Sequence, residues 1–169
     1  HAMEEMAAAG IPTGAFLLPV LPALSDGVTE ITDSLKAIRD AGGTYALFGG
    51  LTMKEGRQRL HWERVLRRID PDLVPRYREL YPGDKWGRAR STYYRELNER
   101  YREAVRSAPV APFIPYSYFT HVLDRPTLAV VLLEQIDAVR EILGMKPVHR
   151  RFVSAVRRTK QRATKELLL

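Results

Sequence analysis

The sequence predicts an α/β fold in which one strand–helix–strand unit is followed by a mainly α-helical region. Two short apolar runs, at residues 15–21 and 44–48, are typical of strands covered on both faces. Between the runs, Ile31, Leu35 and Ile38 recur with the spacing of an amphipathic helix. After the second run no segment favours a strand, whereas helical spacing continues almost to the C-terminus.

The first ten residues are typical of the last turns of a helix that stops at Gly10. A chain that opens inside a helix suggests a truncated protein, and His-Ala-Met is either native or a cloning remnant. Proline donates no ladder hydrogen bond, so the first strand is expected to end near Leu18, before Pro19. Thr29 is the expected N-cap of the helix between the strands. Such a unit has parallel strands and a right-handed crossover.

The helical region is expected to hold five helices. The first is marked by Leu60, Val65, Leu66 and Ile69. The second is capped by Asp70, starts at Pro71 and has Leu73, Val74, Tyr77 and Leu80 on its inner face; the third is capped by Ser91 and carries Tyr94, Leu97, Tyr101 and Val105. The last two span residues 126–143 and 147–167. Two parallel strands do not form a stable sheet alone, so the unit needs partner strands that this chain lacks. We therefore expect a fragment, with the βαβ part at residues 1–57 and a helical extension at 58–169.

The composition excludes several classes of site. The chain has no cysteine, which rules out disulfides, thiol nucleophiles and cysteine-ligated clusters within it. No apolar run approaches the roughly 20 residues of a membrane span, and no signal peptide pattern is present, so we expect a soluble, cytoplasmic protein without membrane contact. The histidines show no ligand spacing, and no metal site is predicted.

The charge is distributed unevenly along the chain. Residues 1–53 carry a net charge of −4 and residues 54–169 a net charge of +11, and arginine outnumbers lysine 21 to 6. One-sided positive charge of this kind suits binding to a phosphate backbone. The alternative is an arginine-favouring genome and a solvated helical surface, and the sequence leaves both open.

Four segments carry a family likeness: "GIPTGAFLLPVLPALSD", "AGGTYALFGGLTMKEGR", "WGRARSTYYRELNERY" and "APFIPYSYF". In this order and spacing they resemble the C-terminal half of radical S-adenosylmethionine proteins. More narrowly, they resemble the DNA repair photolyase-like branch, which is related to spore photoproduct lyase. The likeness is best over residues 10–57 and 86–119 and fades after Leu143.

The resemblance implies the last part of a partial (β/α)6 barrel, with residues 14–18 and 44–48 as its fifth and sixth strands. In this family a Cys-x3-Cys-x2-Cys motif after the first strand holds a 4Fe–4S cluster. The cluster cleaves S-adenosylmethionine to a radical that abstracts hydrogen from the substrate. This chain lacks that region, so we expect the cluster only in a longer parent enzyme and no activity from this chain alone.

The resemblance also implies which residues contact the cofactor. The S-adenosylmethionine of such enzymes rests against the carboxyl ends of the later strands. The residues there in this chain are Pro19, Val20, Gly49, Gly50, Leu51 and Thr52. Glycine at such a position permits close approach. The alternative is that Gly49-Gly50 only forms a tight turn after the strand.

Further residues are candidates for substrate or nucleic acid contact. Lys54 and Arg57 follow the glycine pair and are suited to binding a phosphate or carboxylate group. The alternative is that both are solvated charges of a loop. Trp86 lies near Arg88 and Arg90, and an aromatic ring combined with arginines can stack on bases and pair with phosphates. The alternative is that Trp86 anchors its loop in the core.

The resemblance also makes Tyr116 a catalytic candidate, since family relatives suggest a tyrosine near the barrel mouth; the alternative is a core tyrosine.

Three functions therefore stay open. The first is a fragment of a radical S-adenosylmethionine enzyme that lacks its cluster-binding half. The second is a non-catalytic basic helical module that binds nucleic acid, and the third is a scaffold for a protein partner. The expected partners are the missing half of the barrel and nucleic acid, with self-association through an open sheet edge.

Overall fold

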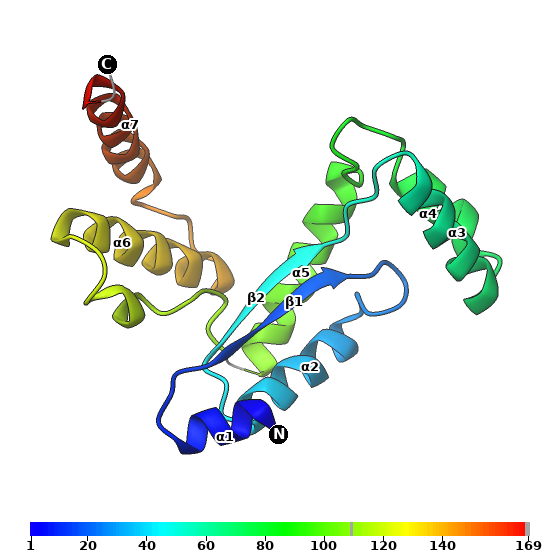
Figure 1. Ribbon diagram of the computed structural model, residues 1–169, viewed down its shortest axis with the longest axis horizontal. Coiled ribbons are helices and arrows are strands. Elements are labelled where there is room, and N and C mark those ends of the chain that lie inside the picture. Colours follow the sequence, from blue (N-terminus) through cyan, green and yellow to red (C-terminus); the bar gives the residue numbers. More distant parts are fainter. Residues whose placement is uncertain (109, 168–169) are drawn as a thin grey trace. The chain divides into compact units, whose positions relative to one another are not determined.

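The computed structural model describes residues 1–108 and 110–167. Its described part is mixed α/β and mostly helical, with a two-stranded parallel sheet (Figure 1). The elements are α1 Ala2–Ala8, β1 Gly14–Val20, α2 Val28–Asp40, β2 Tyr45–Gly50, α3 Arg57–Ile69, α4 Leu73–Leu80, α5 Ser91–Ser107, a 3-10 helix Tyr116–Phe119, α6 Arg125–Ile142 and α7 Arg150–Leu167. They form two compact units, His1–Val110 and Ala111–Leu169. The predicted α/β class, with one strand–helix–strand unit followed by helices, is confirmed.

The two strands run parallel and in register from Gly14 opposite Tyr45 to Leu17 opposite Phe48. The prediction that the first strand ends near Leu18 is wrong. The ladder shifts its register after Leu17 and pairs again at Val20, opposite Gly50. Pro19, which follows a cis peptide bond, falls in this irregular stretch, where a residue without an N–H breaks no ladder hydrogen bond.

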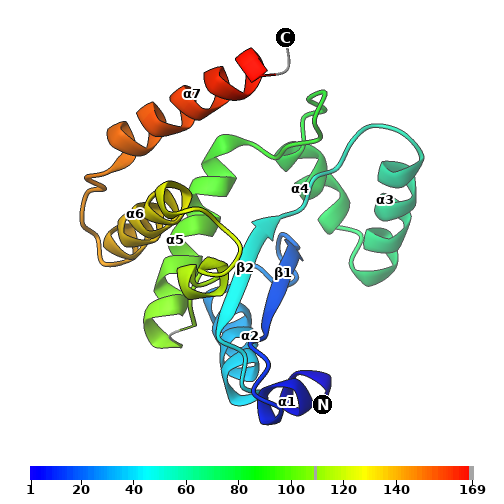
Figure 2. The same cartoon turned by 60° about the vertical axis from the view of Figure 1, so that its left-hand side comes forward.

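One face of the sheet is covered by helices. α2 and α5 pack together beside the strands (Figure 2). On this face the ring of Phe48 stacks on Tyr101 of α5 with centroids 4.0 Å apart, and Ala46 is fully buried. On the opposite face, Phe16 is 62% exposed and Leu18 is 50% exposed. The sheet therefore has one covered and one bare apolar face.

Several helix starts differ from those expected. α2 begins at Val28 because the extended Gly27 precedes it and accepts the first helical hydrogen bond, so Thr29 lies inside the helix. The Asp70 carboxylate accepts from the Asp72 amide at 2.9 Å in a local turn, which delays α4 to Leu73.

One further helix start was predicted wrongly: Ser91 is the first residue of α5, and Arg90 precedes it as the N-cap residue. The helix marked by Leu60, Val65, Leu66 and Ile69 is confirmed as α3, which buries Glu63 and Leu66 and leaves Leu60 and Ile69 exposed.

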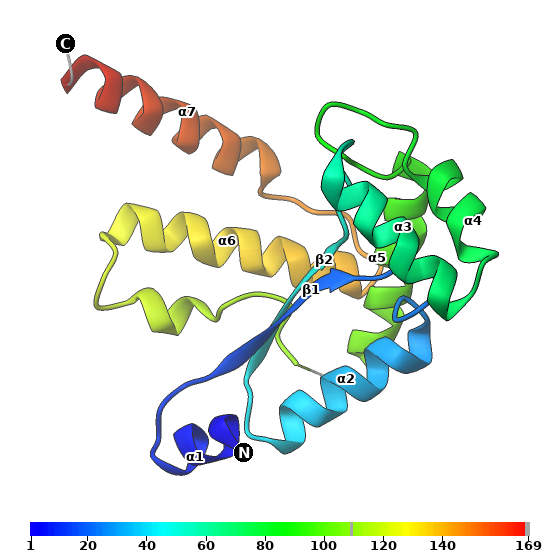
Figure 3. The same cartoon turned by 45° about the vertical axis from the view of Figure 1, so that its right-hand side comes forward.

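Helices α3 and α4 lie side by side in the first unit (Figure 3). Glu63 of α3 is buried and joins them through Arg78 of α4, whose guanidinium donates to both carboxylate oxygens at 3.0 and 2.6 Å. Arg59 adds a second contact to Glu63 within α3. This ion pair holds α3 against α4 and so fixes the helix that follows the exit of β2.

The second unit is built on α6 and α7. The buried Asp137 of α6 accepts from the backbone amides of Val148 and His149 at 2.9 and 2.8 Å, and Arg157 of α7 pairs with Glu134 of α6. The 3-10 helix packs on α6. In the described part of the chain, no helix has the length and apolar character that crossing a membrane requires.

Candidate functional site

The carboxyl ends of the two strands meet at one edge of the sheet, where Val20 and Gly50 are register partners. In α/β proteins this edge is the usual place for a ligand. The structure places all six residues that were assigned to cofactor contact at or just beyond this edge. They are Pro19, Val20, Gly49, Gly50, Leu51 and Thr52.

The chain's own side chains lie against the two glycines. A Cβ atom at Gly49 would lie 2.3 Å from Leu18 Cδ2, and one at Gly50 would lie 2.9 Å from Tyr94 Cε1. Gly49 therefore faces the bare side of the sheet with Leu18, and Gly50 faces α5. Since β2 continues through both residues, the interpretation of the pair as a simple turn is wrong.

Tyrosine hydroxyls hold the segments that follow both strands. Tyr81 and Tyr94 both donate to the carbonyl of Leu51, at 3.1 and 3.2 Å, and Tyr77 donates to the carbonyl of Pro22 at 2.8 Å. Burial raises the pKa of Tyr77 and of Tyr81 far above the usual range. Both hydroxyls therefore stay protonated as donors at neutral pH, and the strand exits are fixed from the helical side.

A cavity of about 470 Å³ lies where β2 leads into α3. It is lined by Leu51, Thr52, Met53, Arg57, Gln58, His61 and Trp62. The four residues from α3 lie on one face of its first two turns. Leu51, Thr52 and Arg57 were predicted from the sequence as site residues, whereas Met53, Gln58, His61 and Trp62 were not. For the last three, their helical spacing after Arg57 was the available signal.

The loop that carries Trp86 returns to the exit of β2. Met53 donates its backbone N–H to the carbonyl of Gly87 at 2.6 Å, which brings Lys54 beside the loop. Lys54 Nζ lies 5.8 Å and Lys85 Nζ 5.0 Å from the centre of the Trp86 ring, which is 52% exposed. The interpretation of Trp86 as an anchor in the core is therefore wrong, and its exposed ring lies within cation–π distance of two lysines.

A buried carboxylate follows β1 and was missed by the sequence analysis. Asp26 accepts from Arg100 Nη1 at 2.6 Å, from the Tyr93 hydroxyl at 3.2 Å and from the Ala23 amide at 2.7 Å. These groups line a polar cavity of about 310 Å³. The position of Asp26 after a strand was a usable signal, whereas nothing in the sequence linked it to Arg100, 74 residues later.

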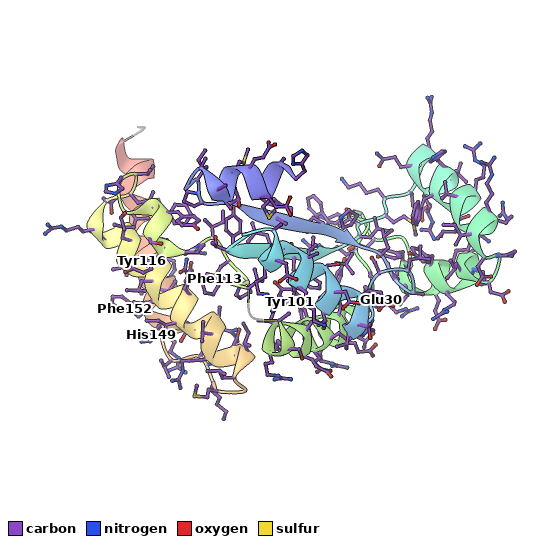
Figure 4. All side chains as sticks on the ribbon, turned by 90° about the horizontal axis from the view of Figure 1, so that it is seen from below. Glu30, Tyr101, Phe113, Tyr116, His149 and Phe152 are labelled. Carbon is purple, nitrogen blue, oxygen red and sulfur yellow. The ribbon has the colours of Figure 1, made fainter. Side chains whose placement is uncertain are left out.

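The other sequence-predicted residues lie elsewhere. Arg90 is used at the end of α4, where its Nε donates to the carbonyl of Glu79 at 2.8 Å. Arg88 is exposed, and its backbone amide donates to Asp84. Tyr116 belongs to the second unit, where its backbone amide donates to Gln135 of α6 (Figure 4). Tyr116 is therefore not among the residues that the first unit brings together.

The residues present do not fit an iron–sulfur cluster. The chain contains no cysteine and so offers no thiolate ligand. Across residues 1–108 and 110–167, no group of three histidine, aspartate or glutamate side chains is placed to hold a metal ion.

Comparison with known proteins finds similarity to uncharacterized mycobacterial proteins. Among them are Rv2578c of Mycobacterium tuberculosis and Mb2609c of Mycobacterium bovis, each 37% identical over 107 residues. The matched region is 63% of this chain and 28% of each relative, so the chain spans little more than a quarter of the curated relatives' length. No family model matches the chain. No solved structure matches it either.

Proposed function

We propose that this chain is the C-terminal part of a radical S-adenosylmethionine enzyme of the DNA repair photolyase-like branch. In this proposal β1 and β2 are the last two strands of a partial (β/α)6 barrel. The missing strands and the 4Fe–4S cluster belong to a preceding part of a longer protein. The chain itself contributes one wall of the cofactor site and is inactive alone.

The observation that carries the proposal is the asymmetry of the sheet. Its two parallel strands have helices on one face, while the other face presents the exposed side chains of Phe16 and Leu18. In a (β/α) barrel, helices cover the outer face of the strands, and the inner face packs against the remaining strands. A bare apolar face on a parallel pair is what one segment of such a barrel would present.

The length of the relatives agrees with a larger protein. Each curated relative extends far beyond the matched region, which is 28% of its length. A protein of that length has room for the four strands that a six-stranded partial barrel would add. The names of these relatives assign no activity, so the chemistry rests on the resemblance of the sequence segments.

The residues proposed to meet S-adenosylmethionine are those at the strand ends. Gly49 faces the bare side of the sheet, which would be the barrel interior. Leu18 lies against Gly49 on that side, and the missing Cβ atom at Gly49 lets both Leu18 and a ligand come close to the backbone of β2. When bound, the cofactor and cluster would supply a 5′-deoxyadenosyl radical; this chain's part is to position the cofactor through Val20, Gly49 and Leu51.

The test uses the longer parent protein, reconstituted anaerobically with iron and sulfide. Gly49→Val is expected to weaken S-adenosylmethionine binding, measured by calorimetry, about tenfold or more, because the added side chain would displace Leu18 toward the proposed site. Gly14→Val is the matched control, since Gly14 lies on the same face at the opposite end of β1. Equal effects of the two substitutions, or no binding by the parent, would overturn the proposal.

The exposed Trp86 favours a second candidate function, a nucleic acid surface on the same chain. Its ring is exposed and has Lys54 and Lys85 close by, a combination that suits stacking on bases and pairing with phosphates. Binding of a single-stranded oligonucleotide should then weaken steeply with salt and fall further in Trp86→Ala. Salt-independent binding, or a Trp86→Ala variant that binds normally, would exclude this candidate.

A further inference from the structure

We propose that the cavity between the exit of β2 and the first turns of α3 binds a nucleoside monophosphate. The site does not depend on the proposed radical chemistry. It shares Leu51 and Thr52 with the proposed cofactor wall, but its charged groups come from α3.

The size and apolar walls of the cavity suit a flat ring. Its volume, about 470 Å³, lies within the range of small-molecule sites, and Leu51, Met53 and Trp62 supply apolar surface. Trp62 also packs on the buried Tyr77, with ring centroids 6.2 Å apart. The indole ring is therefore held in place from behind and offers its remaining surface to a planar ligand.

The polar side of the cavity suits an anion. Arg57 and His61 line it one helical turn apart, and within the described residues neither has a carboxylate partner. Arg59, which lies between them in sequence, is by contrast bound by Glu55 and Glu63. The first turn of α3 has no acidic residue, and its N–H groups have no partner within the helix. An arginine fork with a helix N-terminus is a favoured arrangement for phosphate.

A polar side chain on the lining favours a base over a simple aromatic ring. The amide of Gln58 lines the cavity and can both donate and accept. A nucleobase carries ring nitrogens and exocyclic groups that match such donors and acceptors. A flat ring with hydrogen-bonding groups at its edge, joined to one phosphate, is a nucleoside monophosphate.

The experiment titrates AMP into the purified 169-residue chain and follows binding by calorimetry. The chain has two tryptophans, so a Trp86→Phe variant leaves Trp62 as the sole indole reporter. We expect saturable binding at one site together with a change in Trp62 fluorescence. Absence of saturable AMP binding to the folded chain would overturn the proposal.

Two variants of α3 test the role of the phosphate. Arg57→Gln is expected to weaken AMP binding about tenfold or more, because it removes a charge-assisted hydrogen bond. Arg64→Gln is the matched control: it removes the same charge from an exposed position of α3 outside the cavity lining and should leave binding unchanged. Circular dichroism verifies that both variants are folded. Equal affinities of the two variants would contradict the proposal.

Three other ligands separate this site from the proposed cofactor site. Adenosine and inorganic phosphate should each bind about tenfold or more weakly than AMP, since each lacks half of the recognised group. S-adenosylmethionine carries a sulfonium and no phosphate, and should displace AMP poorly. Displacement as effective as that by AMP would overturn this inference and assign the cavity to the cofactor. Poor displacement of AMP by S-adenosylmethionine would support the separate site. It would not bear on the proposed radical enzyme, which is tested in the parent protein.

Discussion

At the scale of single residues, the carboxylate of Asp26 shows how the chain holds a charge behind its sheet. The side chain is buried and accepts hydrogen bonds from Arg100, Tyr93 and the Ala23 amide. Each accepted bond lowers the cost of keeping the charge out of water. The group therefore fixes the turn after β1 to α5.

Removing the partner of Asp26 should destabilise the fold. Arg100→Met leaves the buried carboxylate without its cation, and we expect the free energy of unfolding to fall by about 1–3 kcal/mol. This expected loss of stability is at the lower end of the range for buried ion pairs because Arg100 is 29% exposed. Urea unfolding measures the change. Arg95→Met, an exposed position on the same helix, should cost less than about 0.5 kcal/mol. Similar losses in the two variants would show that the ion pair contributes nothing.

Gly87 is the second residue whose identity the structure requires. It has a φ of +69°, and a Cβ atom there would lie 2.4 Å from the backbone nitrogen of Lys54. We expect Gly87→Ala to lower the free energy of unfolding by about 2–4 kcal/mol, because backbone must move. In the control Gly83→Ala, φ is also positive, but the nearest atom is the flexible end of Glu55, so the loss should be about 1 kcal/mol. Thermal unfolding that ranks the two variants equally would contradict this account.

At the scale of elements, the ion pair between α3 and α4 makes stability depend on pH. The hydrogen bonds from Arg78 hold the pKa of Glu63 below its ordinary value of 4.5, although burial opposes them. A carboxyl group with a lowered folded-state pKa contributes stability that is complete above pH 4.5 and is lost as pH falls through the folded-state value. Chemical denaturation between pH 7 and pH 3 should therefore show a steeper fall in the wild type than in Glu63→Gln. If the free energy of unfolding fell equally steeply with pH in both proteins, Glu63 would not be the source of the pH dependence.

A tyrosine joins α5 to β2 with the opposite pH dependence. The hydroxyl of Tyr101 donates to the carbonyl of Ala46 at 3.0 Å, and burial raises the pKa of Tyr101 to about 12 (Figure 4). Its neutral form is favoured in the fold, so its contribution is complete below pH 10 and is lost as pH rises toward 12. Tyr101→Phe should cost about 1–2 kcal/mol at pH 7 and reduce the alkaline loss of stability. Loss of stability above pH 10 that is unchanged in Tyr101→Phe would show that another group is responsible.

The sequence predicted most helices and strands, but it predicted few of the contacts between distant residues. Hydrophobic spacing located α2, β2 and most helices, because each buries one face with its own period. It failed at Pro19, where a register shift lets the strand continue, and it did not indicate that the polar Glu63 of α3 is buried. The pairs Asp26–Arg100 and Lys54–Trp86 join distant segments, and a local pattern holds no information about them. The cofactor residues were predicted from a resemblance, and the structure shows only that they share one edge.

At the scale of the whole molecule, the bare face of the sheet gives a prediction about self-association. Phe16 and Leu18 are exposed on this face, and β1 has a free edge in the described part of the chain. Sedimentation velocity should therefore show concentration-dependent association of the isolated chain, and Phe16→Ser with Leu18→Ser should reduce it. The double variant should lose less than about 0.5 kcal/mol of stability in the isolated chain, because exposed apolar residues add little. Association unchanged in the double variant would show that another surface is responsible.

We propose that this chain completes a barrel whose other part binds an iron–sulfur cluster. The most direct measurement is the visible absorption spectrum of the longer parent protein and of the 169-residue chain, both reconstituted anaerobically with iron and sulfide. We expect the absorption of a 4Fe–4S cluster in the parent and none in this chain, which has no cysteine. A parent protein that remains without a cluster, or a cluster bound by this chain alone, would contradict it.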